Sequence, residues 1–259
     1  MIKYTSLEFI VASDEVDYKG RLFLPSLVEK LQIANAINSN VIGLTDEIFK
    51  EKNVNWMLMN DHMILKKPLP TIGDRVFIET VSTDVKGAKF YREDFVYLNE
   101  VKEENLIVHN GSIWIIADRD THIPRRPSFV CDKDEIKKQA DLTLEFAKSI
   151  KDLNPKSDLK EDQKIFDYLA LYSDIDANLH MHNTTYIGLA LDAIASWEML
   201  DVHTQDILVE EIQIRYMREI LLNELVNIYL VKEDEYYHIE GKNAEGESSF
   251  IVKAKVKIG

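Results

Sequence analysis

The chain repeats one order of elements twice, and this repeat constrains its fold more than any other feature of the sequence. In each half the hydrophobic pattern predicts a strand, a polar turn, a long helix and then four strands. The turns 17–22 and 176–181 occupy equivalent places, with an offset of 176 − 17 = 159 residues. We therefore expect an α+β fold built from a duplicated unit, in which an antiparallel sheet wraps around one long, mostly apolar helix and buries that helix almost completely.

Local patterns place the elements of each half. Pro25 suits the first turn of the first helix, because its missing N–H needs no partner there. The apolar residues that follow at helical spacing are Leu27, Leu31, Ala34, Ile37 and Val41. The second helix is predicted from Tyr186 to about Leu200, with one face formed by Ile187, Leu191, Ile194 and Trp197. The predicted strands are 3–12, 55–65, 74–84, 89–98, 106–118, 164–172, 207–217, 224–231, 235–242 and 248–258.

The composition narrows the classes of function. The net charge is 31 − 45 = −14, and such an acidic surface repels nucleic-acid phosphates and anionic lipid. No apolar run approaches the roughly 18 residues of a membrane span, and the first residues lack the apolar region of a signal peptide. The single cysteine, Cys131, forms no intrachain disulfide. We expect a cytoplasmic protein that binds neither nucleic acid nor membrane and needs no cofactor or metal.

The two turns differ in chemistry. The first carries Asp17, Lys19 and Arg21, whereas the second carries Asp176, Asn178 and His180 just before a long helix. If the second segment is extended, a carboxylate, an amide and an imidazole at alternate positions can converge near the electropositive helix N-terminus. Such a set suits the addition of water to a carbonyl group.

Two other interpretations of the second turn stay open at this point. Asp and Asn are common turn formers and helix caps, so the cluster can be purely structural. His180 and His182, together with Asp176, are also residue types that ligate zinc. The other histidines of the chain are isolated, which disfavours the metal. Cys131 lies in the charged stretch 131–163, a poor place for a catalytic thiolate, and this stretch is predicted as a solvated linker, partly helical.

The segment 173–188 resembles the active-site segment of the acyl-acyl carrier protein thioesterases, which include plant plastid enzymes and bacterial relatives. The pattern of that family is Asp-x-Asn-x-His-x-Asn-Asn with Tyr-Ile shortly after, and here His182 replaces the first Asn of the final pair. Shorter matches occur in the same order along the rest of the chain: Asn55-Trp56, Pro70-Thr71-Ile72-Gly73-Asp74, Tyr91-Arg92-Glu93-Asp94-Phe95 and Ser112-Ile113-Trp114.

The resemblance implies a tandem pair of hotdog domains. It implies an acyl-binding domain at 1–130, a linker at 131–163 and a catalytic domain at 164–259, with hydrolysis of fatty acyl-acyl carrier protein to a free fatty acid. The positions that match its catalytic residues are Asp176, Asn178, His180 and Glu219. Ile220 stands where the family often has a cysteine, which excludes a cysteine nucleophile at that position. The implied partner is an acyl carrier protein bearing a fatty acyl phosphopantetheine, and a homodimer is compatible with the sequence.

Three rival functions remain after the resemblance. They are a coenzyme A thioesterase of the hotdog superfamily, a hotdog dehydratase, and an acyl-binding module without catalysis. Docking of an acidic carrier protein needs a local basic surface on this acidic chain. The candidate basic groups are Lys66 with Lys67, Arg119 with Arg125 and Arg126, and Lys133 with Lys137 and Lys138.

Overall fold

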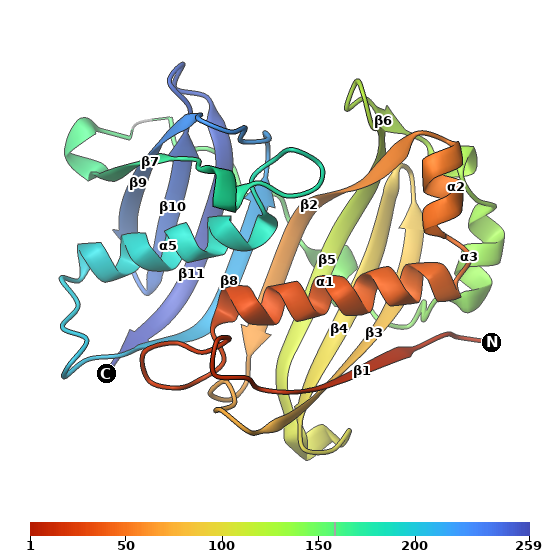
Figure 1. The fold of residues 1–259 in the computed structure, drawn as a ribbon, viewed down its shortest axis with the longest axis horizontal. Helices are drawn as coiled ribbons and strands as arrows, with labels where there is room; N and C mark the ends of the chain where they lie inside the picture. The colour runs from red at the N-terminus through yellow and green to blue at the C-terminus, as the bar shows by residue number, and fades with distance from the viewer. Residues whose placement is uncertain (158) are drawn as a thin grey trace. The chain divides into compact units, whose positions relative to one another are not determined.

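The computed structural model describes residues 1–157 and 159–259 and divides the chain into two compact units (Figure 1). The first unit consists of Met1–Phe23 and Leu27–Lys151, and the second of Leu24–Ser26 and Asp152–Gly259. Residue 158, which falls within the predicted linker, lies outside the described residues.

The first unit is an antiparallel sheet with α1 lying across one of its faces (Figure 1). The strand order is β1-β3-β4-β5-β2, and the short strand β6 pairs with the C-terminal end of β5. The strands are β1 (Thr5–Ile10), β2 (Val54–Leu65), β3 (Arg75–Lys86), β4 (Lys89–Leu98), β5 (Leu106–Asp118) and β6 (Pro124–Arg125). The helices are α1 (Leu24–Val41), α2 (Asp46–Glu51), α3 (Lys133–Gln139) and α4 (Phe146–Ser149).

Helix α1 begins as the sequence predicts, but its second half is oriented differently. Leu27, Leu31 and Ala34 are buried, whereas Ile37 and Val41 are 41% and 43% exposed. The prediction that these two residues belong to a buried face is therefore wrong. Asn35 and Asn38 are buried in their place, because the sheet below presents polar side chains that need hydrogen-bond partners. The repeat pattern predicts that this helix is buried almost completely, and that prediction is also wrong.

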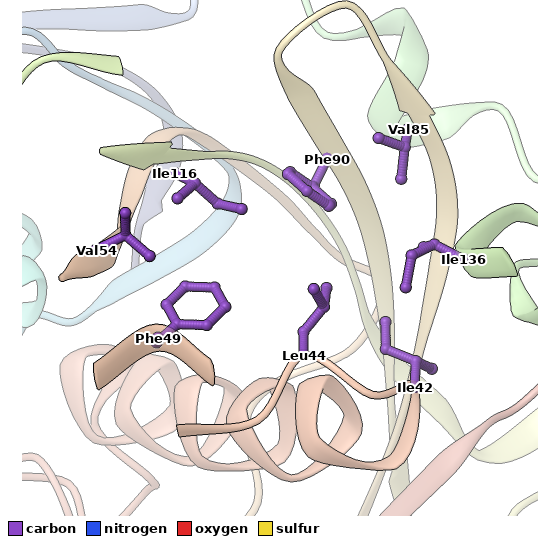
Figure 2. Close-up of a cluster of buried hydrophobic side chains, with 8 residues drawn as sticks. All are labelled: Ile42, Leu44, Phe49, Val54, Val85, Phe90, Ile116 and Ile136. Carbon is purple, nitrogen blue, oxygen red and sulfur yellow. The ribbon is translucent and has the colours of Figure 1, made fainter. Parts of the chain in front are cut away.

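An apolar cluster closes one end of the first unit (Figure 2). It joins the end of α1 to α2, to the sheet and to α3, and its members are Ile42, Leu44, Phe49, Val54, Val85, Phe90, Ile116 and Ile136. Ile136 belongs to the stretch that its charge predicts to be a solvated linker, yet it is buried here. The expectation of a solvated linker is thus wrong for α3, because the helix is amphipathic and turns its one large apolar residue inward.

The second unit repeats the arrangement with five further strands and with α5 (Asn183–Trp197) lying across them (Figure 1). The strand order is β8-β11-β10-β9-β7, all pairs being antiparallel. These strands are β7 (Lys164–Leu169), β8 (Ile207–Tyr216), β9 (Leu225–Glu233), β10 (Tyr236–Lys242) and β11 (Ser248–Ile258). Strand, helix and four further strands follow in the same order in both units, which confirms the predicted repeat and the α+β class.

Helix α5 starts and ends three residues earlier than predicted. Ile187 and Ile194 are buried as expected, but Trp197 is exposed because it is the last residue of the helix. Below the helix, the ring of Phe250 packs edge-on against Tyr186 and passes Gly241 so closely that a Cβ there would lie 2.1 Å from it. Within the described residues, no helix is both long and apolar enough to cross a membrane.

Candidate active site

The segment 175–181 is a closed turn in the second unit, and Asp176 holds it together. The Oδ1 atom of Asp176 accepts hydrogen bonds from the backbone N–H groups of Asn178 (2.7 Å) and His180 (3.3 Å). Its own N–H donates to the carbonyl of His180 (2.8 Å). The other carboxylate oxygen accepts from the Asn178 side chain at 3.3 Å. The segment is therefore not extended, and Asp176 and Asn178 come together by turn geometry.

Leu179 adopts a backbone conformation that is rare for its type. Its φ is +69°, and its side chain is exposed. A left-handed conformation is unfavourable for residues that carry a Cβ atom, and such strain is concentrated at functional sites. The turn thus keeps a strained residue directly beside His180.

Glu219 reaches the turn from the loop that follows β8. The backbone N–H groups of Met217 and Arg218 both donate to the carbonyl of Ser249, which fixes the start of this loop. The N–H of Met181 donates to the carbonyl of Ile220 at 2.8 Å, which ties the loop to the turn. As a result His180 Nε2 lies 3.1 Å from Glu219 Oε2, with both side chains about four-fifths buried. A mostly buried imidazole and carboxylate in contact form an acid–base pair.

The first unit contains the same turn with the same backbone hydrogen bonds. Asp17 Oδ1 accepts from the N–H groups of Lys19 (2.8 Å) and Arg21 (3.0 Å), and its own N–H donates to the carbonyl of Arg21 (2.7 Å). The N–H of Leu22 donates to the carbonyl of Pro70, as that of Met181 does to Ile220. The predicted equivalence of the two turns is confirmed at the level of single hydrogen bonds.

Comparison of the two turns distinguishes the residue that closes the turn from the residues that differ between the two copies. Both turns have the aspartate, so its carboxylate is required by the turn itself. The side chains that differ at matching positions are Lys19 for Asn178, Gly20 for Leu179, Arg21 for His180 and Leu69 for Glu219. In the first unit Arg21 makes an ion pair with Asp17 at 2.9 Å. An acid–base pair like that of His180 and Glu219 cannot form there, because leucine replaces the glutamate.

Tyr186 is a residue of this site to which the sequence assigns no role. It is buried in the first turns of α5, where its ring packs against Tyr216 and Phe250. Burial raises the pKa of its hydroxyl, the nearby Glu219 and Asp176 carboxylates raise it further, and a hydrogen bond from the backbone N–H of Ile220 opposes them. Tyr186 therefore stays neutral, and its hydroxyl accepts a hydrogen bond from the backbone of Ile220, the residue that follows Glu219. Its position at the predicted start of the second helix, directly after the polar turn, is the sequence signal that could have identified Tyr186 as a site residue.

Several sequence expectations receive an answer from this geometry. Asn178, His180 and Asp176 share one turn, and Glu219 joins them through His180. In the described part of the chain, the ligand atoms of Asp176, His180 and His182 do not lie within 4.8 Å of one another, so the zinc set is not formed. His182 occupies the N-cap position of α5 without a capping hydrogen bond from its side chain. Burial raises the pKa of the Cys131 thiol to about 11, which leaves it a poor nucleophile.

Solved structures share the fold of this chain over almost its whole length. An acyl-ACP thioesterase from Bacteroides thetaiotaomicron matches with a TM-score of 0.74, covering 98% of both chains at 19% identity. The 12:0-ACP thioesterase from Umbellularia californica matches with a TM-score of 0.76, covering 99% of this chain and 98% of that chain at 15% identity. These likenesses and the duplicated sheet-and-helix unit define a tandem double hotdog fold.

Profiles of one family match both halves of the sequence. The acyl-ACP thioesterase N-terminal domain matches residues 3–137, and the acyl-ACP thioesterase C-terminal domain matches residues 157–257. The chain therefore belongs to the acyl-ACP thioesterase family.

Two curated relatives come from Arabidopsis thaliana. Oleoyl-acyl carrier protein thioesterase 1 is 24% identical over 253 residues, which are 92% of this chain and 67% of that protein. Palmitoyl-acyl carrier protein thioesterase is 26% identical over 156 residues, which are 58% of this chain and 36% of that protein. The matched regions thus span between about a third and two thirds of the relatives' own lengths.

Proposed function

We propose that the protein hydrolyses the thioester of fatty acyl-acyl carrier protein and releases a free fatty acid. The observation that carries this proposal is the contact between His180 Nε2 and Glu219 Oε2, which lie 3.1 Å apart. The equivalent turn of the first unit has no such pair, because arginine and leucine stand at these two positions. Family membership supports the class of substrate, and the printed names of the Arabidopsis relatives specify acyl carrier protein.

In the proposed mechanism Glu219 is the general base. A water molecule attacks the thioester carbonyl carbon while Glu219 accepts one of its protons, and His180 orients the carboxylate through their contact. The negative charge that develops on the carbonyl oxygen is stabilised near the N-terminus of α5. When the C–S bond breaks, the proton passes to the leaving sulfur, which gives the free acid and the carrier-protein thiol.

Asp176 fits the base role less well than Glu219. Backbone N–H groups occupy its Oδ1, and the Asn178 side chain occupies its Oδ2, so a water molecule would have to displace one of these donors. Its counterpart Asp17 makes the same backbone hydrogen bonds in a turn without the pair. We infer that Asp176 and Asn178 position the turn that carries His180.

This division of roles predicts the result of two substitutions at one position. Asp176→Asn keeps an oxygen that can accept both backbone N–H bonds, so we expect kcat within about tenfold of the wild type. Asp176→Ala removes the acceptor, the turn loses its closure, and kcat should fall about a hundredfold or more. Steady-state kinetics with circular dichroism as a folding control measure both. If Asp176→Asn loses as much activity as Asp176→Ala, the carboxylate charge itself takes part in the chemistry.

We propose that residues 1–130 take the acyl chain and that residues 164–259 carry the catalysis, in a cytoplasmic enzyme. Apolar side chains beneath α1, such as Met63 and Val96, support the first assignment. Among the basic groups considered for carrier docking, Arg125 pairs with Asp118 at 2.7 Å and Lys137 with Asp84 at 3.5 Å. Lys66 and Arg126 are exposed and are the better candidates for contact with an acidic carrier.

One assay tests the function against its rivals. Acyl carrier protein and coenzyme A thioesters of the same acyl chain are incubated with the protein, and free thiol and free fatty acid are measured. We expect release from both with at least tenfold higher kcat/KM for the carrier-bound substrate. Equal or better hydrolysis of the coenzyme A thioester would indicate a coenzyme A thioesterase. Formation of an enoyl product from a 3-hydroxyacyl thioester would indicate a dehydratase, and binding without release an acyl-binding module.

A further inference from the structure

The interior of the first unit contains a band of polar side chains between two apolar regions. The strand register places them on one face, where Asp94 lies opposite Thr80 and Asn110, and Asp61 lies opposite Ser112. The hydrogen bond from Thr80 to Asn35 shows that this face is the one covered by α1. Asp94, Asp61 and Asn110 are 0%, 4% and 1% exposed.

The half of the band nearest β3 is saturated with hydrogen bonds. Arg92 Nη1 donates to Asn38 Oδ1 (2.7 Å) and to Thr80 Oγ1 (2.9 Å), and the Thr80 hydroxyl donates to Asn35 Oδ1 (2.8 Å). Asn38 in turn donates to Thr5 at 2.9 Å. This half has no hydrogen-bonding capacity to offer a ligand and serves to hold the helix on the sheet.

The half nearest β2 and β5 is unsaturated. Asn110 Nδ2 donates to Asp94 Oδ2 at 2.9 Å, but no partner within residues 1–157 and 159–259 reaches Asp61 Oδ1, Asp94 Oδ1 or Asn110 Oδ1. On α1 the buried Nε2 of Gln32 likewise has no partner in this part of the chain, and Gln32 precedes Asn35 by three residues on the same helix face. A buried polar atom without a partner loses its hydrogen bonds to water and gains none in return, so a missing partner is expected here.

The chemistry of the unpaired atoms specifies that partner. Asp94 Oδ1 and Asn110 Oδ1 require a hydrogen-bond donor, and the protonated Asp61 carboxyl can donate in return, which together match a hydroxyl group. A ketone oxygen accepts only, and an alkyl chain offers nothing. A cation is disfavoured, because the Arg92 guanidinium already lies beside Asp94 and because burial raises the pKa of Asp61 to about 8, which keeps that carboxyl neutral at pH 7.

We propose that Asp61, Asp94 and Asn110 bind a hydroxyl group on the acyl chain of the substrate, so that the enzyme favours hydroxylated acyl chains over unsubstituted ones. This inference rests on the proposed thioesterase function and on the proposal that the first unit takes the acyl chain. Because the three side chains are fixed on neighbouring strands, the recognised hydroxyl must sit at one position along the chain.

The test compares carrier-bound acyl chains of one length that differ in a single group. The set contains the unsubstituted chain, a series of positional hydroxy isomers, and the ketone that corresponds to the preferred isomer. We expect one isomer to exceed the unsubstituted chain and the ketone by about tenfold or more in kcat/KM. Asp61→Leu, a substitution of similar volume without polar atoms, should abolish that preference and improve use of the unsubstituted chain. Thr83→Val, which removes another buried unpaired hydroxyl on β3, is the matched control and should keep it.

Binding of the free hydroxy fatty acid, measured by calorimetry on the wild-type protein, gives a readout that does not depend on catalysis or on a variant. Equal rates and equal binding for all isomers would overturn the inference and would mean that the three oxygens hold ordered water. A preference that persists in Asp61→Leu would overturn it as well. If no thioester is hydrolysed at all, the proposed function fails, while selective binding of one hydroxy acid would still support the site.

Discussion

Glu219→Gln is expected to lower kcat by about a hundredfold to ten-thousandfold. Glutamine is nearly isosteric and can still contact His180 Nε2, which lies 3.1 Å from the native carboxylate, but it cannot accept a proton from water. The turn should persist, because Asp176 and the Met181–Ile220 backbone hydrogen bond hold it without this carboxylate. The change should therefore fall on kcat with KM almost unchanged. Stopped-flow or steady-state release of carrier-protein thiol measures it.

The control for this substitution is Glu245→Gln, which makes the same change of charge at an exposed position in the hairpin between β10 and β11. It should behave as the wild type. If Glu219→Gln retains more than a tenth of the wild-type kcat while its circular dichroism is native, Glu219 is not the base. The chemistry would then have to be assigned to Asp176 or His180.

The second large effect concerns the contribution of Asp61 to stability, which we expect to fall as pH rises from about 4 to 8. Burial raises the pKa of this carboxyl from 3.8 to about 8, so the folded state keeps a proton that the unfolded state releases across this interval. Each pH unit then costs up to about 1.4 kcal/mol of unfolding free energy, with an upper limit of about 6 kcal/mol over the whole interval. Below pH 4 the carboxyl is neutral in both states, and above about 8 it is ionised in both, so the contribution levels off.

Asp61→Asn should remove this dependence, since an amide does not titrate. Relative to the wild type, the variant gains stability as pH rises, and its advantage is largest at pH 8 and above. Urea unfolding followed by tryptophan fluorescence suits the measurement, because Trp56 and Trp114 pack in the first unit's aromatic cluster. Asp14→Asn, at an exposed site, should leave the pH profile unchanged. Parallel profiles for Asp61→Asn and the wild type would show that Asp61 is ionised in the folded protein.

The sequence predicts the fold of this chain well where hydrophobic periodicity reports burial directly. The strands, both long helices and the repeat are recovered because Leu27, Leu31 and Ile194 follow the expected spacing and are buried. The pattern fails at Ile37 and Val41, because the face that α1 buries there is decided by Arg92, more than fifty residues away. The hydrophobic pattern also fails in α3, because one apolar residue, Ile136, among charged neighbours is too little to show a helical period.

The candidate site could be predicted only in part. The resemblance and the polar turn identify Asp176, Asn178, His180 and Glu219, and the structure brings them into one place. That the segment is a closed turn could not be read from spacing, since it depends on hydrogen bonds between Asp176 and backbone groups and on the contact with Ile220. The unpaired oxygens of Asp61, Asp94 and Asn110 also escape the sequence, because strand register alone brings them together.

The paired turns differ in how much backbone strain they contain. Gly20 adopts the left-handed backbone that glycine favours, whereas its counterpart Leu179 adopts the same conformation at a steric disadvantage. The turn without the acid–base pair combines this glycine with an internal Arg21–Asp17 ion pair, and both features favour a stable backbone. The turn that carries His180 contains the strained leucine instead. Because one polypeptide contains both turns, the stability of one can offset the strain of the other.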